Sequence, residues 1–259
     1  MKLSLQGHTI VIASGDYGVA GHPGDGSSSG CLSGYGQNQT IFNAPYPNGC
    51  PWVTSVGGSM VEPDKTVRDH ESAFQVCSPV SGNCYSSTGG FSNYFTRPAY
   101  QETAIAKWLA YHDPGYPTYL ADMNASNIGE GGGIYNRAGR AVPDVAANAA
   151  NMLLYIGGEP AKLYGTSLAA PIWGSIITLI NQQRTIAGKG PVGFLNPVLY
   201  TNPWALERYH QWLESWLWDE RIYSCEWVGS CHRSRNTGKW PTIRIILIVH
   251  MLIILRLSF

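Results

Sequence analysis

The order of apolar and polar residues predicts a few regular elements separated by long stretches rich in glycine and serine. The longest apolar segment is YGTSLAAPIWGSIITLINQQR, residues 164–184. It predicts a tight turn at Gly165 and Thr166, followed by a long helix that begins at Ser167. Pro171 fits the first helical turn, where a missing N–H costs little.

Shorter runs predict the remaining core elements. Thr9 to Ala13 is rich in β-formers and bounded by glycines, which predicts a central parallel strand buried on both faces. Val53 to Val61 predicts a strand, a turn and a second strand. Residues 136–151, NRAGRAVPDVAANAAN, predict a segment that enters the core. Pro98 to Tyr111 predicts an amphipathic helix. Its apolar side carries Ile105, Trp108 and Leu109.

Composition narrows the class of protein. With 259 residues, 44% of them hydrophobic, the chain can bury a full core in one or two domains. Charged residues make up 13%, against about 25% in ordinary soluble proteins, and the net charge is zero, so we expect no nucleic-acid partner. The sequence has no CxxC, HExxH or GxxxxGK[ST] motif, which argues against zinc, metalloprotease and nucleotide sites.

The first residues do not form a secretory signal. Gln6, Gly7 and His8 interrupt the apolar run between Met1 and Ala13, whereas a signal peptide needs an unbroken one. We therefore expect Met1 to be an internal residue of a larger protein, truncated at its N-terminus.

Two cysteine pairs are close enough in sequence to suggest disulfides. Cys31 and Cys50 bracket one loop, and Cys77 and Cys84 flank a turn of serine and glycine. Because six cysteines allow many connectivities, these pairings are hypotheses based on proximity. Disulfides indicate an oxidising compartment, and free buried thiols in a cytosolic protein are the alternative.

Two N-glycosylation sequons, at Asn38 and Asn124, lie in loop-like sequence. Each is a weak signal alone, and both agree with a secretory origin.

Ser167 is the first candidate for chemistry. At a helix N-terminus its hydroxyl would lie among free backbone N–H groups, where it can act as a nucleophile, although a plain N-cap is the alternative. ASGDYG places Asp16 on a glycine turn directly after a predicted strand. Asp144 is a second acid, which we interpret as a structural turn carboxylate rather than a catalytic one.

A glycine run suggests a place for a substrate. Gly89, Gly90, Phe91 and Ser92 combine a flexible backbone with an aromatic residue, a combination that suits an edge approached closely by an extended peptide. A plain turn is the alternative interpretation.

Five motifs together resemble the sedolisins, the serine-carboxyl peptidases, and most of all their secreted fungal tripeptidyl-peptidases. The motifs are ASGDYG, GCPWVTSVGG, STGGFSNYF, GRAVPDVAAN and YGTSLAAP, in that order along residues 1–206. The resemblance implies a subtilisin-like α/β fold with a central parallel sheet, with Ser167 as nucleophile and Asp16 in the oxyanion hole. Tyr164 departs from the small residue usual in the family.

The resemblance also implies a base that this sequence lacks. The family uses a Glu as general base, held by an Asp, in place of histidine, which suits acid pH. These two residues lie on a helix at i and i+4 before the SGD motif, and no Glu here has an Asp four positions later. We therefore expect the chain as written to be catalytically incompetent.

The segment 207–259 differs sharply from the rest. It holds five of the nine tryptophans but two of the thirty glycines, and its apolar run, Ile245 to Leu255, is shorter than the about 20 residues of a membrane span. A GPI-type signal is a weaker interpretation. The family places calcium here, but no carboxylate cluster is visible, so we expect no cofactor for this chain.

Residues 207–238 can be written back into permitted codons, and because tryptophan has a single codon, its positions fix the nucleotides around them. Translated one nucleotide later, these codons give an amino-acid sequence that resembles the family's calcium segment. We expect a peptidase domain over residues 1–206 and a frame-shifted tail, altered and without a role, over residues 207–259.

The functional expectation is a fragment of a tripeptidyl-peptidase or acid endopeptidase that acts on peptide or protein substrates. We expect a monomer from an extracellular family, with no membrane partner. The alternative is a secreted, non-catalytic pseudopeptidase that binds peptides along residues 89–92. A subtilisin-type Ser/His/Asp enzyme ranks third, because no HGTH-like motif is present and an Asp replaces the Asn donor of subtilisins.

Overall fold

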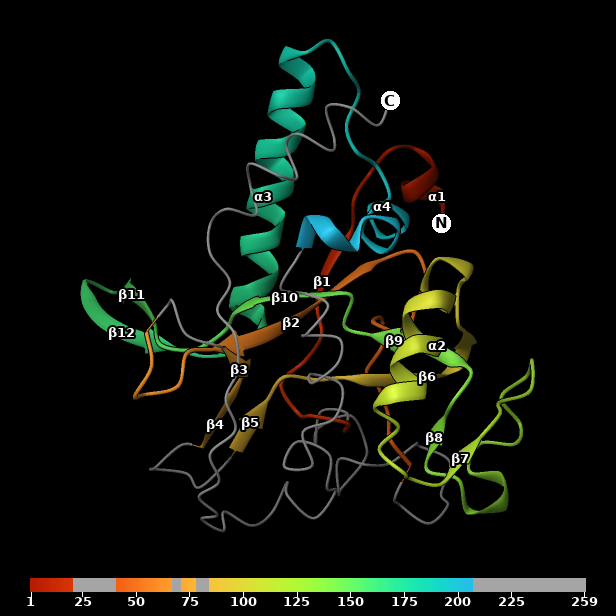
Figure 1. Ribbon diagram of the computed structural model, residues 1–259. Helices are drawn as coiled ribbons and strands as arrows, with labels where there is room; N and C mark the ends of the chain where they lie inside the picture. The colour runs from red at the N-terminus through yellow and green to blue at the C-terminus, as the bar shows by residue number, and fades with distance from the viewer. Residues whose placement is uncertain (21–40, 67–70, 78–83, 207–259) are drawn as a thin grey trace.

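The computed structural model in Figure 1 describes residues 1–20, 41–66, 71–77 and 84–206. Helices and strands are mixed in an α/β arrangement. In chain order the elements are α1 (Lys2–Leu5), β1 (Val11–Ala13), β2 (Thr54–Met60), β3 (Ser72–Ala73), β4 (Gln75–Cys77), β5 (Cys84–Ser86), β6 (Gly90–Thr96), η1 (Ala99–Gln101), α2 (Glu102–Tyr111), β7 (Thr118–Tyr119), η2 (Glu130–Gly132), β8 (Tyr135–Asn136), β9 (Gly139–Val142), β10 (Val145–Asn148), β11 (Met152–Ile156), β12 (Glu159–Leu163), α3 (Thr166–Ile186), α4 (Asn196–Thr201) and η3 (Pro203–Leu206).

The main sheet has the order β1-β2-β10, with all three strands parallel and β3 added antiparallel to β2. Val11 pairs with Thr54, and Val145 pairs with Val56. The predicted parallel strand after Thr9 is confirmed. Its predicted burial on both faces is wrong, because β1 is half-buried and is an outer strand of the sheet in the described part of the chain.

β2 corrects the prediction of strand, turn and strand over residues 53–61. The structure has one continuous, fully buried strand that runs through Gly57 and Gly58. A Cβ on Gly58 would lie 2.4 Å from the Cβ of Ala149, so close packing rather than a turn requires the glycine.

Helix α3 packs against all three parallel strands (Figure 1). Its buried residues recur every three or four positions, which turns one face toward the core. They include Ala169, Trp173, Ile177, Ile180 and Arg184. The helix starts at Thr166, so Pro171 is the sixth helical residue, and its predicted place in the first turn is wrong.

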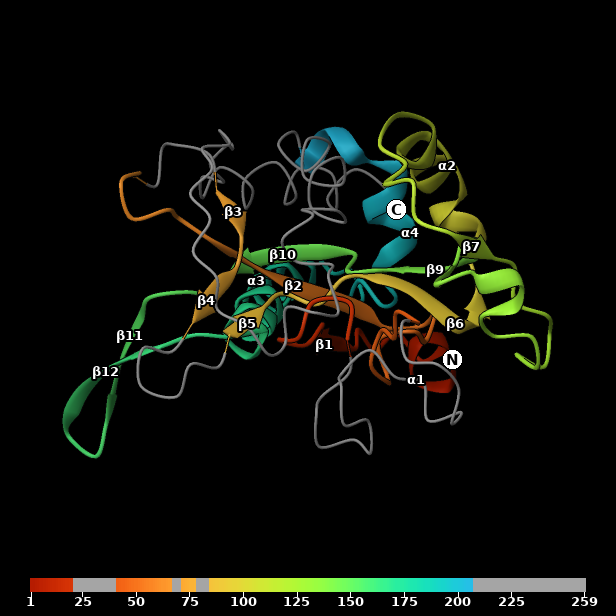
Figure 2. The same cartoon turned by 90° about the horizontal axis from the view of Figure 1, so that it is seen from below.

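A second core lies at the other end of the molecule, where α2 covers the antiparallel pair β6-β9 (Figure 2). Here Phe91 stacks on Tyr135 and packs against Trp108. The predicted amphipathic helix is confirmed, since Ile105, Trp108 and Leu109 are its buried residues.

Several sequence-based expectations fall on residues outside the described ranges. These are Cys31, Asn38 and the whole of 207–259 with its apolar run. Among the helices that the structure describes, none has the length and apolar character needed to cross a membrane.

Candidate functional site

The loop after β1 meets the first residue of α3. β1 ends at Ala13, and Asp16 follows three residues later at the carboxyl edge of the parallel sheet, where open α/β sheets bind ligands. The Asp16 Oδ1 atom accepts hydrogen bonds from the Thr166 backbone N–H, at 2.7 Å, and from the Thr166 hydroxyl, at 2.9 Å. The structure therefore brings the predicted acid directly against the predicted turn.

Thr166 completes this contact and was not among the predicted site residues. Its Oγ1 donates to Asp16 and accepts a hydrogen bond from the Gly15 N–H at 3.1 Å. The side chain is buried, so both bonds are shielded from water. The only sequence signal is its position inside the Gly-Thr-Ser triplet, because its partners lie about 150 positions earlier.

Gly165 must be a glycine for two independent reasons. Its φ of 127° is in a region that L-residues avoid, and a Cβ there would lie 2.9 Å from the Asp16 Oδ2 atom. Its N–H donates to the Ala149 carbonyl at 2.8 Å. The glycine thus lets the helix start next to the second carboxyl oxygen of Asp16.

Ser167 is the second residue of α3, and it is exposed. Within the described residues its hydroxyl takes no part in a hydrogen bond, whereas Thr166 beside it takes part in three with Asp16 and Gly15. The hydroxyl therefore lies at the positive end of a 21-residue helix, free to meet a ligand.

The predicted cleft residues begin beside the Asp16 loop. Thr88 donates its N–H to the Gly15 carbonyl at 2.9 Å, and Gly89 donates to the Gly18 carbonyl at 3.3 Å. Gly90 has a φ of 132°, and a Cβ on it would meet no atom within 4 Å. Both glycines are buried, and a peptide approaching them would have to displace or pass their neighbours.

The other two predicted cleft residues turn inward. Phe91 is 1% exposed in the second core, and the Ser92 Oγ accepts the N–H groups of Tyr94 and Phe95. Their side chains hold the strand β6 in place. All four residues are buried, and a role for residues 89–92 in substrate binding stays a prediction.

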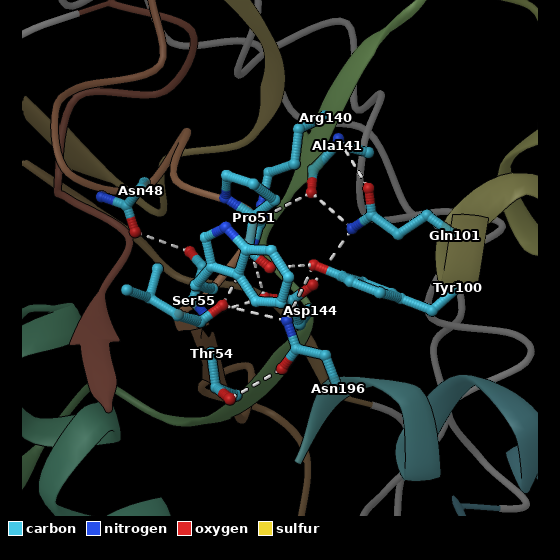
Figure 3. A network of polar contacts seen from close by, with 12 residues as sticks. Asn48, Pro51, Thr54, Ser55, Tyr100, Gln101, Arg140, Ala141, Asp144 and Asn196 are labelled. Atoms are coloured by element: carbon cyan, nitrogen blue, oxygen red, sulfur yellow. Dashed lines mark hydrogen bonds and ion pairs between the residues drawn. The ribbon is translucent and has the colours of Figure 1, made fainter. Parts of the chain in front are cut away.

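Asp144 is at the centre of a separate buried network (Figure 3). It is 1% exposed, its Oδ2 atom accepts the Ser55 N–H at 2.8 Å, and it pairs with the buried Arg140. Its Oδ1 atom accepts from Gln101 at 3.1 Å and from Tyr200 at 3.0 Å. The network joins β2, β9, η1 and α4, as expected of a structural carboxylate.

The charges in this network stabilise each other. Burial lowers the pKa of Arg140, but the charge of Asp144, its hydrogen bond to Arg140 and the charges of Tyr100 and Tyr200 together outweigh burial and hold that pKa above its ordinary value. Burial and, secondarily, the charge of Asp144 raise the pKa of Tyr100, so its hydroxyl remains a donor to the Pro51 carbonyl at 2.7 Å.

The remaining predicted sites are peripheral. Cys77 and Cys84 form the predicted disulfide between β4 and β5. Cys50 carries a free thiol, which contradicts the predicted disulfide with Cys31. Cys31 itself lies outside the described residues. Asn124 is exposed in a loop, so its glycosylation stays a prediction.

Calcium was expected in the family but not in this chain. In the described ranges no three His, Cys, Asp or Glu side chains are grouped so that they could hold a metal ion. The described residues therefore do not fit a calcium site, and the segment 207–259 is not described.

Comparisons with known proteins agree on one family. The chain is 50% identical over 204 residues to aorsin of Aspergillus oryzae, which covers 78% of this chain and 30% of aorsin. It is 44% identical over 203 residues to tripeptidyl-peptidase sed1 of Aspergillus fumigatus, again 78% of this chain and 30% of the relative. Human tripeptidyl-peptidase 1 is 36% identical over 202 residues, 77% of this chain and 29% of the human protein. No protein-family model matches the chain.

Among solved structures, the fold is similar to that of Pseudomonas sedolisin, a serine-carboxyl proteinase complexed with pseudo-iodotyrostatin. The TM-score is 0.50 with 21% sequence identity, over 77% of this chain and 44% of that one. The structural similarity supports the fold alone, whereas the sequence identity to the relatives supports the family. The chain, which spans about 30% of the length of the fungal relatives it matches, belongs to the sedolisin family of serine-carboxyl peptidases.

Proposed function

We propose that this chain carries the nucleophile and oxyanion half of a peptide-bond-hydrolysing site, with Ser167 as nucleophile and Asp16 in the oxyanion hole. The observation that carries the proposal is the pair of hydrogen bonds from Thr166 to Asp16, at 2.7 and 2.9 Å, which fixes the carboxyl group beside the serine. We further propose that residues 1–206 form the peptidase unit.

The two carboxyl oxygens of Asp16 have different surroundings. Oδ1 is committed as an acceptor to Thr166, whereas the backbone of Gly165, without a side chain, leaves Oδ2 uncovered. A protonated Asp16 would donate from Oδ2 to the oxyanion that forms when the Ser167 Oγ adds to a peptide carbonyl. A rigid donor of this kind stabilises the developing charge without reorganising.

A base for Ser167 is the missing part. No hydrogen bond connects its hydroxyl with another described residue, and nucleophilic serines need an adjacent group to accept the proton. The chain by itself should therefore bind and position peptides without turnover. The same observation favours the second candidate function, a non-catalytic peptide-binding protein that is secreted like the family's fungal members.

The experiment uses the full chain and a peptide aldehyde labelled with ¹³C at the carbonyl carbon. Adding the Ser167 O–H across the C=O forms a hemiacetal, in which the hydroxyl proton moves to the former carbonyl oxygen. Because this is an equilibrium, it does not need the missing base. We expect the hemiacetal signal in ¹³C NMR with the wild-type chain and none with Ser167→Ala. A well-folded wild-type chain without the signal would contradict the proposal.

A second measurement tests whether the base is missing. We expect the wild-type chain to hydrolyse no tripeptide p-nitroanilide between about pH 3 and 7, because without a base both nucleophile activation and general-acid assistance are lost. Turnover that disappears in Ser167→Ala would show that the described chain is a complete enzyme.

A further inference from the structure

The hairpin of β11 and β12 is inserted between the end of β10 and the start of α3. Its strands pair from Met152 with Leu163 to Ile156 with Glu159, closed by two glycines that both have positive φ. Figures 1 and 2 both show the hairpin projecting past the carboxyl edge of the sheet, away from the rest of the molecule.

One face of this hairpin is a continuous apolar strip. Because side chains alternate along a strand and register sets cross-strand neighbours, six residues share this face. They are Met152, Leu154, Ile156, Glu159, Ala161 and Leu163. Leu154 is 37% exposed and Ile156 is 56% exposed, and the only charged residue on the face is Glu159, next to the turn.

The opposite face adds to the exposed apolar surface. Leu153 is 58% exposed and Tyr155 is 72% exposed. A two-stranded hairpin is marginally stable in water, and three strands or a packed face are needed for independent stability. Among the described residues the hairpin therefore has both an unpaired strand edge and apolar area available to a third strand.

The base of the hairpin is fixed to the candidate site. Gly165 donates its N–H to the Ala149 carbonyl at 2.8 Å, and the Tyr164 hydroxyl donates to the Asn151 Oδ1 atom at 3.0 Å. Leu163, the last residue of β12, is four positions before Ser167. The apolar strip is thus joined to the start of α3 by the residues that directly precede Ser167.

We propose that the hairpin is a peptide-binding strip. An extended, uncharged peptide segment adds as a third strand at the hairpin edge, and its alternate apolar side chains lie beside Leu154 and Ile156. Main-chain hydrogen bonds supply affinity in this mode, while side-chain contacts supply specificity. A five-residue strand covers about 17 Å at about 3.3 Å per residue, so four or five peptide residues fit along it.

The peptide is the occupant that the position favours. The strip ends at Leu163, four positions before the candidate nucleophile, which favours the substrate of that site as its occupant. The near absence of charge on the strip face selects neutral, apolar side chains over charged ones. This inference rests on the proposed function, since it names the substrate class of the same site.

The test measures binding by fluorescence anisotropy, with all variants made in a Ser167→Ala background so that no hydrolysis interferes. The probe is a fluorescein-labelled decapeptide of alternating valine and threonine. Leu154→Glu combined with Ile156→Glu should weaken binding at least tenfold. The control is Met123→Glu, which adds one such charge at a residue that is 97% exposed on the loop after β7, and it should leave the affinity within twofold.

Circular dichroism first establishes that each variant is folded. Unchanged probe affinity in the folded hairpin variant overturns the inference. Equal binding of a decapeptide of alternating glutamate and threonine also overturns it, because the strip would then not select apolar side chains.

A second copy of the chain bound at the strip would be detected by its effect on the oligomeric state. If the chain is dimeric by analytical ultracentrifugation, and the hairpin variant is monomeric with unchanged probe affinity, the strip binds a second copy and the inference fails. The hemiacetal test is independent of all these outcomes. Its failure removes the proposed function, whereas loss of hairpin binding alone leaves Ser167 and Asp16 in their proposed roles.

Discussion

Asp16 and Asp144 each tie a helical element to the parallel sheet, but they do so in opposite ways. Asp144 uses both carboxyl oxygens, faces a buried guanidinium and is 1% exposed. Asp16 uses Oδ1 for Thr166, while Oδ2 lies beside a glycine and an exposed serine. We call the cluster around Asp144 closed, because both carboxyl oxygens are bonded, and the cluster around Asp16 open, because only one is.

The difference separates structural from chemical roles for the same side chain. A carboxylate whose acceptors are all occupied can stabilise a fold but has nothing left with which to meet a reactant. A site that does chemistry must keep some polar groups unpaired at its surface. In the proposed site these are the Ser167 hydroxyl and the second oxygen of Asp16, which have no hydrogen bond to another described residue. Substituting one residue at a time in each cluster and measuring unfolding tests this difference.

The largest effect should come from opening the closed cluster. Arg140→Met leaves Asp144 buried without its counter-charge, and breaking a buried pair from one side costs about 3–5 kcal/mol. Urea unfolding at pH 7 measures the loss in the free energy of unfolding. A loss below about 1 kcal/mol, the value of an exposed pair, would show that the network is not closed.

Crowding the open cluster should cost less. Gly165→Ala forces a side chain into φ 127° and within 2.9 Å of Asp16 Oδ2, and strain of this kind costs about 1–3 kcal/mol. The matched control is Gly188→Ala, where φ is 72° and a Cβ would meet no atom within 4 Å. Equal unfolding free energies for the two variants would remove the clash with Asp16 from the explanation.

Thr166 allows the contact with Asp16 to be broken without changing side-chain shape. Thr166→Val removes the hydroxyl that joins Asp16 Oδ1 to the Gly15 N–H, and we expect a loss of about 1–2 kcal/mol in thermal unfolding. Thr166→Ser keeps the hydroxyl and should retain the hemiacetal signal. If valine and serine have the same effect on both readouts, the hydroxyl does not position Asp16.

The smallest effect should come from an exposed ion pair, Arg137 with Asp113. Burial raises the pKa of Asp113, but the Gly115 N–H and the Arg137 guanidinium outweigh it and hold the pKa below its ordinary value. Both side chains are 37% exposed, so solvent screening limits the pair to about 0–1 kcal/mol. Arg137→Gln measures this contribution.

The pH dependence of this pair has a definite sign. Because the folded pKa of Asp113 is lowered, its stabilisation is present above the unfolded value, about 3.9, and disappears as pH falls through the folded pKa. The difference between Arg137→Gln and wild type should therefore shrink in acid. A difference that grows below pH 4 would contradict this assignment.

The sequence predicted the elements whose pattern is local. The helices around Trp108 and Trp173 follow from the spacing of their apolar residues, and the motif that contains Asp16 lies against the start of α3, at Thr166. The turn expected within residues 53–61 was wrong because a glycine that makes room for a distant side chain, Ala149, has the same sequence signature as a glycine in a turn.

Long-range hydrogen bonding was beyond the reach of the pattern. Nothing near Thr166 in sequence indicates that its hydroxyl would join Gly15 to Asp16, and the closed network of Asp144 combines residues from four separate elements. The exposed apolar strip was also missed, because Met152 to Ile156 alone looks like a buried strand. Only the register with β12 shows that it stands apart from the core.

Pro171 has a consequence for how motion is divided along α3. A proline at this position has no N–H to give to the Ser167 carbonyl one turn earlier, so the ladder of helical bonds is interrupted there. The turn that holds Ser167 is fastened instead to Asp16, on the sheet side of the molecule. In native-state hydrogen exchange, the amides of that turn should open together with the Asp16 loop, while the amides after Pro171 exchange with the core of the helix.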